Sequence, residues 1–377
     1  MHPQLVCPKF CLSVCLSVPG RSPLPTERVG LALTAAAALV ALADMLTIAL
    51  RCFIAGTAAA VALKLSKQAV RSRTTLLSAA AGAPCPPRLD APELRALLIS
   101  NSKVAGLEYL DHAEAHMKDF LGELSSFVLF VPYAQADRDG YAARVRARFG
   151  AMGYELRSMH EFGTADAIRA AVLEASCIFV GGGNTYRLMK CLQEDPALLP
   201  LVRERVAAGE LLYIGSSAGT NVACPTMRNT NDMPICWPRS LAGLGLVPFQ
   251  INTHYIDAAR EVEHHMGETR ETRLQEFMED NAVPVLGLRE GSAVLVRGSR
   301  SATLLGPARK SAQVTWSGAR LFSREDGCPR DLADGASLDF LMQGDHDVEA
   351  LFDTALVPAG GGAALGGGDG GDTFKSG

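Results

Sequence analysis

Short apolar runs that alternate with helical patterns constrain the fold of this chain more than any other feature of its sequence. Strands that alternate with helices are typical of βαβ units, which build a mostly parallel sheet covered by helices on both faces. In such sheets the functional side chains gather at the carboxyl ends of the strands. The predicted strands are residues 94–99, 127–132, 177–180, 211–214, 285–288 and 293–296, and helices are predicted over residues 107–124 and 141–149.

Composition shifts near the two ends of the chain predict its domain organisation. Residues 83–92 contain four prolines, which is typical of a linker. Residues 358–377 form a glycine-rich, low-complexity segment that cannot bury a core. We therefore predict a leader with its linker over residues 1–92, a folded domain over residues 93–357 and a disordered tail over residues 358–377.

The predicted leader contains two apolar runs, at residues 30–43 and 52–63. Each run is shorter than the roughly 20 residues that span a bilayer. Joining them would place Asp44 and Arg51 inside the bilayer, at a cost of about 3 kcal/mol each. We expect the leader to have no part in the chemistry and the protein to be cytoplasmic. A weak membrane anchor or an organelle-targeting signal is the alternative, because basic residues follow the second run.

Charge and cysteine content exclude several classes of function. The formal net charge is -4, and aromatic residues make up 6% of the chain. Nucleic-acid binding normally needs a concentrated basic surface or aromatic stacking platforms, so no nucleic-acid partner is predicted. The cysteines beyond residue 94 form no C-x-x-C pair and no zinc-finger spacing. We predict reduced cysteines that bind no metal.

The strongest local signal for chemistry is residues 211–219, an apolar strand that runs into the pattern G-x-S-x-G and then a helix-compatible segment. The glycines permit a sharp turn that lifts the central serine above the sheet edge. Ser217 is therefore the candidate nucleophile, and Ser216 is a lining residue. The backbone N–H of Ala218 would lie at a helix N-terminus, where it could stabilise an oxyanion.

A serine nucleophile needs a base, normally a histidine that a carboxylate orients. Of the seven histidines in the predicted domain, His254 alone follows an apolar run that ends near a strand end. It is the candidate general base. Asp232 lies between Ser217 and His254 in the chain, and Glu290 lies directly beyond a predicted strand. Either carboxylate could orient His254, and the pattern does not decide between them.

A glycine-rich turn at residues 181–185 follows another predicted strand. Such a turn allows the backbone to approach a ligand closely. It lacks the lysine and the spacing of a P-loop. If Ser217 is the nucleophile, Gly182 or Gly183 would supply a second oxyanion donor. A purely structural tight turn is the alternative.

Taken together, these segments resemble peptidase E, the aspartyl dipeptidase family of serine peptidases. The resemblance extends over nearly the whole region from residue 94 to about residue 306. The main matching segments are residues 181–185, 215–226, 230–234 and 250–254, and weaker similarities lie at residues 98–102, 267–271 and 287–291. Each segment is modest alone, but their order and spacing make the set specific.

The resemblance implies a class I glutamine amidotransferase-like, or flavodoxin-like, three-layer α/β sandwich. It also implies cleavage after an amino-terminal aspartate, without metal or cofactor. The family's nucleophile and general base match Ser217 and His254. Its Ser-His-Glu triad favours Glu290 as the partner of His254, with Asp232 as an essential-looking neighbour.

Substrate recognition is also implied by the matching segments. Selectivity for a side-chain carboxylate needs a cation in the pocket. Arg270, in the segment 267–271, is the candidate, and Asn184 in the glycine-rich turn is the second predicted substrate-binding residue. One departure is visible: Thr253 stands where the bacterial pattern usually has proline.

The predicted partner is therefore a small aspartyl dipeptide, and the sequence does not predict the oligomeric state. One alternative is a related hydrolase of aspartyl-linked polymers such as cyanophycin. A second is a non-catalytic binding protein on the same fold. A third, a membrane-tethered scaffold, depends on the apolar leader.

Overall fold

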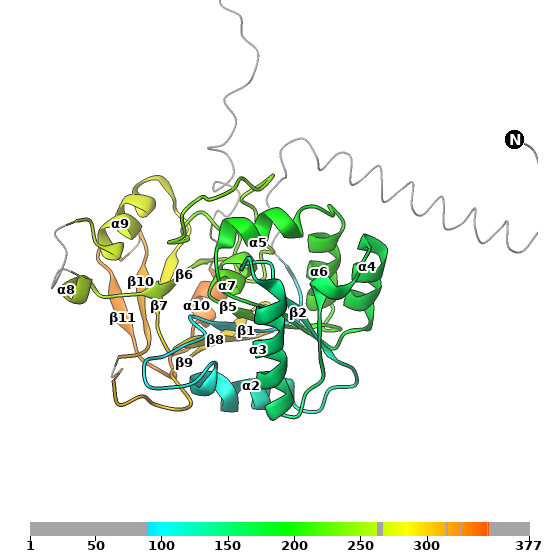
Figure 1. The fold of residues 1–377 in the computed structure, drawn as a ribbon. Coiled ribbons are helices and arrows are strands. Elements are labelled where there is room, and N and C mark those ends of the chain that lie inside the picture. Colours follow the sequence, from blue (N-terminus) through cyan, green and yellow to red (C-terminus); the bar gives the residue numbers. More distant parts are fainter. Residues whose placement is uncertain (1–88, 262–266, 314–315, 325, 345, 347–377) are drawn as a thin grey trace, which may run out of the picture. The chain divides into compact units, whose positions relative to one another are not determined.

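A seven-stranded sheet is the centre of the computed structural model, which describes residues 89–261, 267–313, 316–324, 326–344 and 346 (Figure 1). Its strand order is β3-β2-β4-β5-β1-β8-β9. The first five strands of that order are parallel, and the last two pair antiparallel. The strands are β1 (Arg95–Ile99), β2 (Val128–Val131), β3 (Leu156–Ser158), β4 (Cys177–Val180), β5 (Leu212–Ser216), β8 (Ala293–Arg297) and β9 (Ser301–Leu305).

The parallel part of this sheet has the order of a flavodoxin-like fold. Strands β3, β2, β4 and β5 follow the order 2-1-3-4 of that fold, and β1 takes the fifth place. Strand β1, the first strand in the described part of the chain, therefore lies between the other parallel strands and the antiparallel pair β8 and β9. This confirms the predicted α/β class with a mostly parallel sheet.

Helices cover both faces of the sheet, as predicted, because side chains alternate along the buried strands. Leu97 and Ile99 belong to one apolar cluster and Ala96 and Leu98 to the other. The first cluster contains side chains of helices α2 and α3 on one face of the sheet. The second contains side chains of α4, α5, α6 and α7 on the other face. The helices are α2 (Glu114–Leu121), α3 (Arg138–Ala151), α4 (Ala165–Glu174), α5 (Thr185–Leu192), α6 (Leu198–Ala207) and α7 (Ala218–Ala223).

The predicted helices are found with different starting points. Helix α3 contains the predicted residues 141–149, and its apolar face is regular. The helix predicted over residues 107–124 begins later, as a 3₁₀ turn over Asp111–Ala113 followed by α2. Gly106 and Leu110 have positive φ angles of 79° and 61°, so the backbone before residue 111 turns instead of forming helix.

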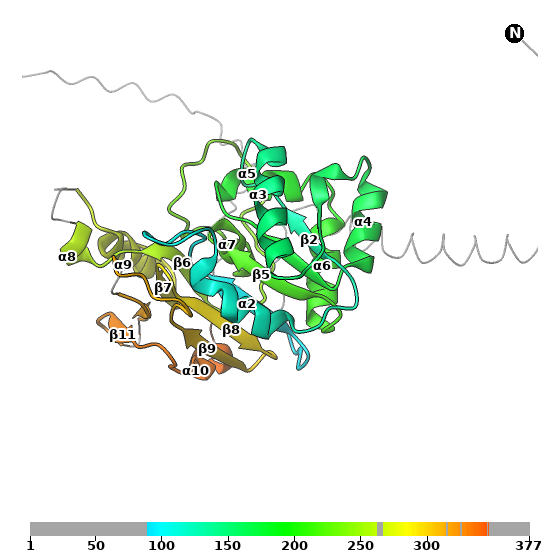
Figure 2. The ribbon, with the colours of Figure 1, turned by 60° about the horizontal axis from the view of Figure 1, so that its bottom comes forward.

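A second, four-stranded sheet was not foreseen from the sequence. Its order is β11-β10-β7-β6, and only β6 and β7 are parallel. Figure 2 shows it with α8 and α9 on the side away from α4 and α6. Its elements are β6 (Gln250–Tyr255), β7 (Val285–Arg289), β10 (Ala319–Phe322), β11 (Arg330–Leu332), α8 (Ala258–Glu261) and α9 (Arg270–Asp280), and the described chain ends near α10 (Asp339–Gln343).

The two sheets share one core. Ile251, Leu286 and Leu288 of the smaller sheet belong to the same apolar cluster as Leu98 and Val294 of the larger one. The predicted strands at residues 285–288 and 293–296 both exist, but they belong to different sheets. The chain crosses from one sheet to the other in the short turn between them, where Gly291 has a φ of 85°.

None of the described helices is long and apolar enough to cross a bilayer. The apolar runs at residues 30–43 and 52–63 and the glycine-rich tail at residues 358–377 lie outside the described residues. The predicted domain boundaries, the anchor alternative and the cytoplasmic location therefore stay predictions.

Candidate active site

Ser217 lies in a sharp turn between β5 and α7. Its φ of 54° and ψ of -110° are unusual for a residue with a side chain, and its backbone N–H donates to the Ile99 carbonyl at 3.0 Å. The flanking glycines are required by space: a Cβ on Gly215 would lie 2.6 Å from the Gly219 oxygen, and one on Gly219 would lie 2.1 Å from the Val180 oxygen. The turn therefore has the geometry predicted for a nucleophile elbow.

His254 lies near the carboxyl end of β6 and faces this serine. Its Nε2 atom is 2.8 Å from Ser217 Oγ, and its φ of 54° is again positive. The pairing of β6 with β7 shifts register between Asn252 and Tyr255, so His254 lies in a β-bulge. Bulges next to active sites commonly re-aim a side chain.

Glu290 completes a hydrogen-bonded series of three side chains. Its Oε1 atom is 2.9 Å from His254 Nδ1, and the hydrogen bond from His254 lowers the pKa of the Glu290 carboxyl. An ionised carboxylate accepts hydrogen bonds and donates none. The proton of the neutral imidazole must therefore lie on Nδ1, which leaves Nε2 to accept the Ser217 hydroxyl proton.

Asp232, the other candidate carboxylate, has different partners. Its Oδ2 atom accepts from the backbone N–H of Thr185 at 2.7 Å, from the Thr185 hydroxyl at 2.6 Å and from the Thr230 hydroxyl at 3.2 Å. Thr185 is the first residue of α5, where a carboxylate is favoured by the helix dipole. Of the two candidate carboxylates, Glu290 thus lies beside His254 and Asp232 lies at the start of α5.

The glycine-rich turn after β4 lies against Ser217. A Cβ on Gly182 would lie 2.9 Å from Ser217 Cβ, and Gly183 has a φ of 138°. Burial raises the pKa of Tyr141, while hydrogen bonds from Tyr109 and from the backbone of Gly182 lower it. Gly182 is thus the residue of the turn next to Ser217, and the oxyanion roles of Gly182, Gly183 and Ala218 stay predictions.

Replacing Gly182 by alanine is expected to lower kcat by about 100-fold. The added methyl group would lie 2.9 Å from Ser217 Cβ, so it must displace the Ser217 side chain from its position beside His254. Gly150→Ala is the matched control, since a Cβ at that helical position meets no atom within 4 Å. Steady-state rates of the two variants and the wild type check this. Equal rates for all three proteins would show that Gly182 is not in contact with the reacting group.

The two predicted substrate-binding residues lie beside this site. Arg270, the first residue of α9, donates from Nη1 to the His254 carbonyl. Its charge is also among the causes that lower the pKa of Glu290, after the larger effect of the His254 hydrogen bond. Asn184 caps α5 by accepting from the Arg187 N–H at 3.0 Å, and its amide donates to the Met233 carbonyl at 2.8 Å. Both ends of the Asn184 side chain are thus engaged within the protein.

Sequence reasoning missed two side chains at the end of β1. The Ser100 hydroxyl contacts the backbone of His254, and the Asn101 carboxamide accepts from the Gly291 N–H at 2.8 Å. The available signal was weak: the segment 98–102 follows a buried strand and matches the family pattern only in part.

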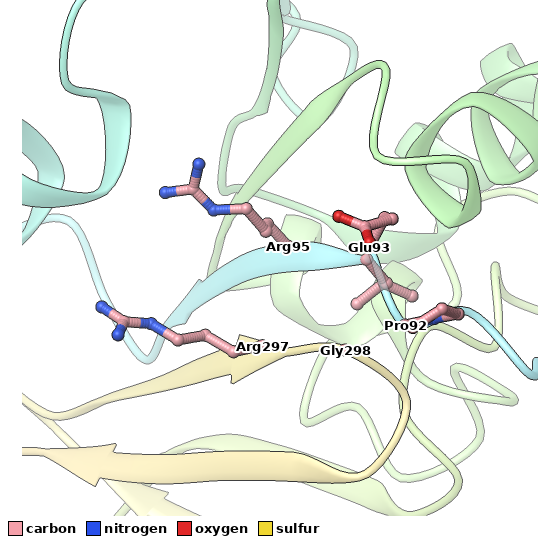
Figure 3. A pocket seen from close by; sticks show the side chains of 6 residues that line it. Pro92, Glu93, Arg95, Arg297 and Gly298 are labelled. Atoms are coloured by element: carbon pink, nitrogen blue, oxygen red, sulfur yellow. The ribbon is translucent and has the colours of Figure 1, made fainter.

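A separate hollow lies at the opposite end of β1. Arg95 and Arg297 are directly paired across β1 and β8 and extend in the same direction there (Figure 3). Arg95 donates to the Phe120 carbonyl at 2.8 Å and lies over the Phe120 ring. This hollow is far from the carboxyl ends of the strands, so it has no part in the site around Ser217. Within the described residues no group of three or more His, Cys, Asp or Glu side chains could hold a metal ion.

A serine on a strand-to-helix elbow, hydrogen-bonded to a histidine that a carboxylate holds, defines the class of serine hydrolases. Comparison with known proteins makes the class more specific. Residues 96–304 match the model of peptidase family S51. Peptidase E from Streptomyces coelicolor is 47% identical over 258 residues, which are 68% of this chain and 97% of the relative. The chain belongs to peptidase family S51, which confirms the predicted resemblance.

The probable alpha-aspartyl dipeptidase from Drosophila melanogaster is 44% identical over 248 residues, which are 66% of this chain and 97% of the relative. Among solved structures, a putative peptidase E from Listeria monocytogenes is 20% identical and aligns with a TM-score of 0.44 over 58% of this chain and 99% of that one.

Proposed function

We propose that the protein is a serine dipeptidase that hydrolyses dipeptides with an amino-terminal aspartate. The observation on which this depends is the hydrogen-bonded series Ser217–His254–Glu290 at the carboxyl ends of β5, β6 and β7. The names of the relatives from Streptomyces coelicolor and Drosophila melanogaster, peptidase E and probable alpha-aspartyl dipeptidase, support the choice of substrate.

In the first half-reaction Ser217 Oγ attacks the carbonyl carbon of the aspartyl residue. His254 Nε2 takes the hydroxyl proton, and Glu290 stabilises the imidazolium that forms. The C–N bond then breaks, and the same proton passes from Nε2 to the leaving amine. The product is an aspartyl ester of Ser217.

In the second half-reaction water replaces the amine. His254 removes a proton from the water, whose oxygen attacks the ester carbonyl, and the proton returns to Ser217 Oγ as free aspartate leaves. The backbone N–H groups of Ala218 and of Gly182 or Gly183 would hold the oxyanion in both halves. Each such donor is typically responsible for about 10²–10³ in turnover.

We assign selectivity for aspartate to Arg270. Its guanidinium lies within reach of the His254 carbonyl and close enough to Glu290 to lower the pKa of that carboxyl. A guanidinium pairs with a carboxylate through parallel N–H donors, so the substrate's β-carboxylate would be bound beside the imidazole. Asn184, at the start of α5, would contact the substrate by exchanging its bond to the Met233 carbonyl.

Arg270→Ala is expected to lower the ratio of kcat/KM for Asp-Leu over Ala-Leu by about 10- to 100-fold, because a hydrogen bond to a charged group contributes about 1.5–3 kcal/mol. Arg273→Ala is the matched control: Arg273 lies on the same helix, and its side chain is 59% exposed. An unchanged ratio in Arg270→Ala would remove Arg270 from the aspartate pocket.

The proposed function is tested by a panel of substrates with the wild-type protein. Release of leucine from Asp-Leu is expected to exceed that from Asn-Leu, Glu-Leu and Ala-Leu, and the tripeptide Asp-Leu-Ala should be a poor substrate. Cleavage of β-linked aspartyl-arginine without cleavage of Asp-Leu would favour the polymer-directed alternative. No cleavage of any of them by the folded protein would favour a binding protein on this fold.

A further inference from the structure

The β-bulge that positions His254 leaves backbone groups of two strands without their regular partners. Asn252 pairs with Gly287 and Tyr255 with Arg289, so Thr253 and His254 together lie opposite the single residue Leu288. An extra residue of this kind interrupts the ladder of hydrogen bonds and is left unpaired. Buried backbone groups need partners, because each unpaired one costs free energy.

The Ser100 hydroxyl fills this gap. It accepts from the His254 N–H at 3.0 Å and donates to the Leu288 carbonyl at 2.8 Å. One hydroxyl thus bridges the two strands where their direct hydrogen bond is interrupted. Ser100 is fully buried, and its own N–H donates to the Ser292 carbonyl at 3.0 Å, which holds the residue in place.

The same strand end touches the other two members of the series. The Ile99 carbonyl accepts from the Ser217 N–H at 3.0 Å, and the Asn101 carboxamide accepts from the N–H of Gly291, the residue after Glu290, at 2.8 Å. Three consecutive residues at the end of β1 therefore contact the backbone at or beside Ser217, His254 and Glu290.

We propose that Ser100 is a positioning residue for the general base: its hydroxyl replaces the ladder bond lost in the bulge and holds His254 at its positive φ with Nε2 directed at Ser217. This inference rests on the proposed roles of Ser217 and His254, but not on the identity of the substrate. Without the hydroxyl, the His254 N–H and the Leu288 carbonyl lose their shared partner, and the backbone can relax towards a regular strand. That relaxation moves the imidazole away from Ser217.

The test is covalent labelling of the full chain with a fluorophosphonate probe, which reacts with activated serines whatever the peptide specificity. The labelling rate constant reports how well His254 activates Ser217, and the labelled fraction at the end point reports how much protein is folded. Ser100→Ala is expected to label about 100-fold more slowly than the wild type and to reach the same end point. Ser158→Ala is the matched control, because Ser158 is equally buried but bonded to His160, and it should label at the wild-type rate.

A merely structural role would give the opposite pattern, a lower end point at an unchanged rate constant, and would overturn the proposal. A wild-type rate with a full end point would overturn it as well. If Ser100→Ala does not fold, Ser100→Cys keeps a similar shape with a weakly bonding thiol, and it should label at least 10-fold more slowly; labelling at the wild-type rate would contradict the proposal.

Failure of the proposed function gives a different result in the same assay. A wild-type protein that reacts with the probe but does not cleave Asp-Leu would reject the proposed substrate and still measure the effect of Ser100. A folded wild type that does not react with the probe would reject Ser217 as nucleophile, and the role of Ser100 with it.

Discussion

Ser217→Ala is expected to lower kcat for Asp-Leu by about 10⁶-fold, the size of loss seen when the nucleophile of a serine protease is removed. The reason is that Ser217 carries the hydroxyl at hydrogen-bonding distance from His254 Nε2, and no other hydroxyl among the described residues takes that place. The backbone should be undisturbed, because alanine tolerates the φ of 54° no worse than serine does.

The neighbouring serine provides a sharp control. Ser216 is buried, and its hydroxyl has no hydrogen-bond partner in the structure, so Ser216→Ala should leave kcat within about threefold, since nothing is left unpaired. Leucine release measured by chromatography compares both variants with the wild type. Loss of activity in Ser216→Ala together with activity in Ser217→Ala would move the nucleophile to the other serine of the motif.

Glu290→Gln is expected to lower kcat by about 10⁴-fold, as in other triads where an amide replaces the carboxylate and disturbs the imidazole tautomer. The carboxylate accepts the Nδ1 proton at 2.9 Å, and it is the group that would stabilise the imidazolium. KM should change little, because Glu290 reaches the substrate only through His254. Steady-state kinetics together with thermal unfolding check that the variant is folded.

Asp232→Asn is the comparison that separates the two carboxylates. Asp232 accepts three hydrogen bonds from Thr185 and Thr230. The uncharged asparagine side chain would accept them less well, so Asp232→Asn is expected to lower the free energy of unfolding by about 1–3 kcal/mol. Its effect on kcat should be at least 10-fold smaller than that of Glu290→Gln. A larger loss of kcat in Asp232→Asn than in Glu290→Gln would reverse the assignment of the two residues.

The elements that surround the site could be predicted from the sequence because their signals are local. The apolar runs before Gly181 and Gly215 are buried strands of ordinary length, and a glycine turn at a strand end is a short-range pattern. His254 could be chosen as the candidate base because it follows an apolar run near a strand end, whereas the residue pattern left Asp232 and Glu290 open and only the family resemblance favoured Glu290. Parallel neighbouring strands bring their carboxyl ends to one edge, as β6 and β7 do for His254 and Glu290, whereas Ser217 follows β5 of the other sheet.

The parts that could not be predicted depend on contacts between distant segments. Two buried strands joined by a short turn, such as β7 and β8, normally form a hairpin, yet here they belong to different sheets. Asp232 and Glu290 are both loop carboxylates in the sequence, and only the packing of β6 beside β7 brings Glu290 to His254. The role of Ser100 depends on a bulge that no residue pattern in β6 indicates.

An aspartyl phosphonate diphenyl ester tests the nucleophile and the aspartate pocket together, because such a reagent modifies a serine nucleophile only when the reagent's side chain is accepted in the neighbouring pocket. Peptide mapping by mass spectrometry locates the modified residue. We predict modification of Ser217, at a rate at least 100-fold faster than with the alanyl phosphonate. Modification of another residue, or equal rates with the two reagents, would contradict the assignment of Ser217 as the nucleophile of an aspartate-selective dipeptidase.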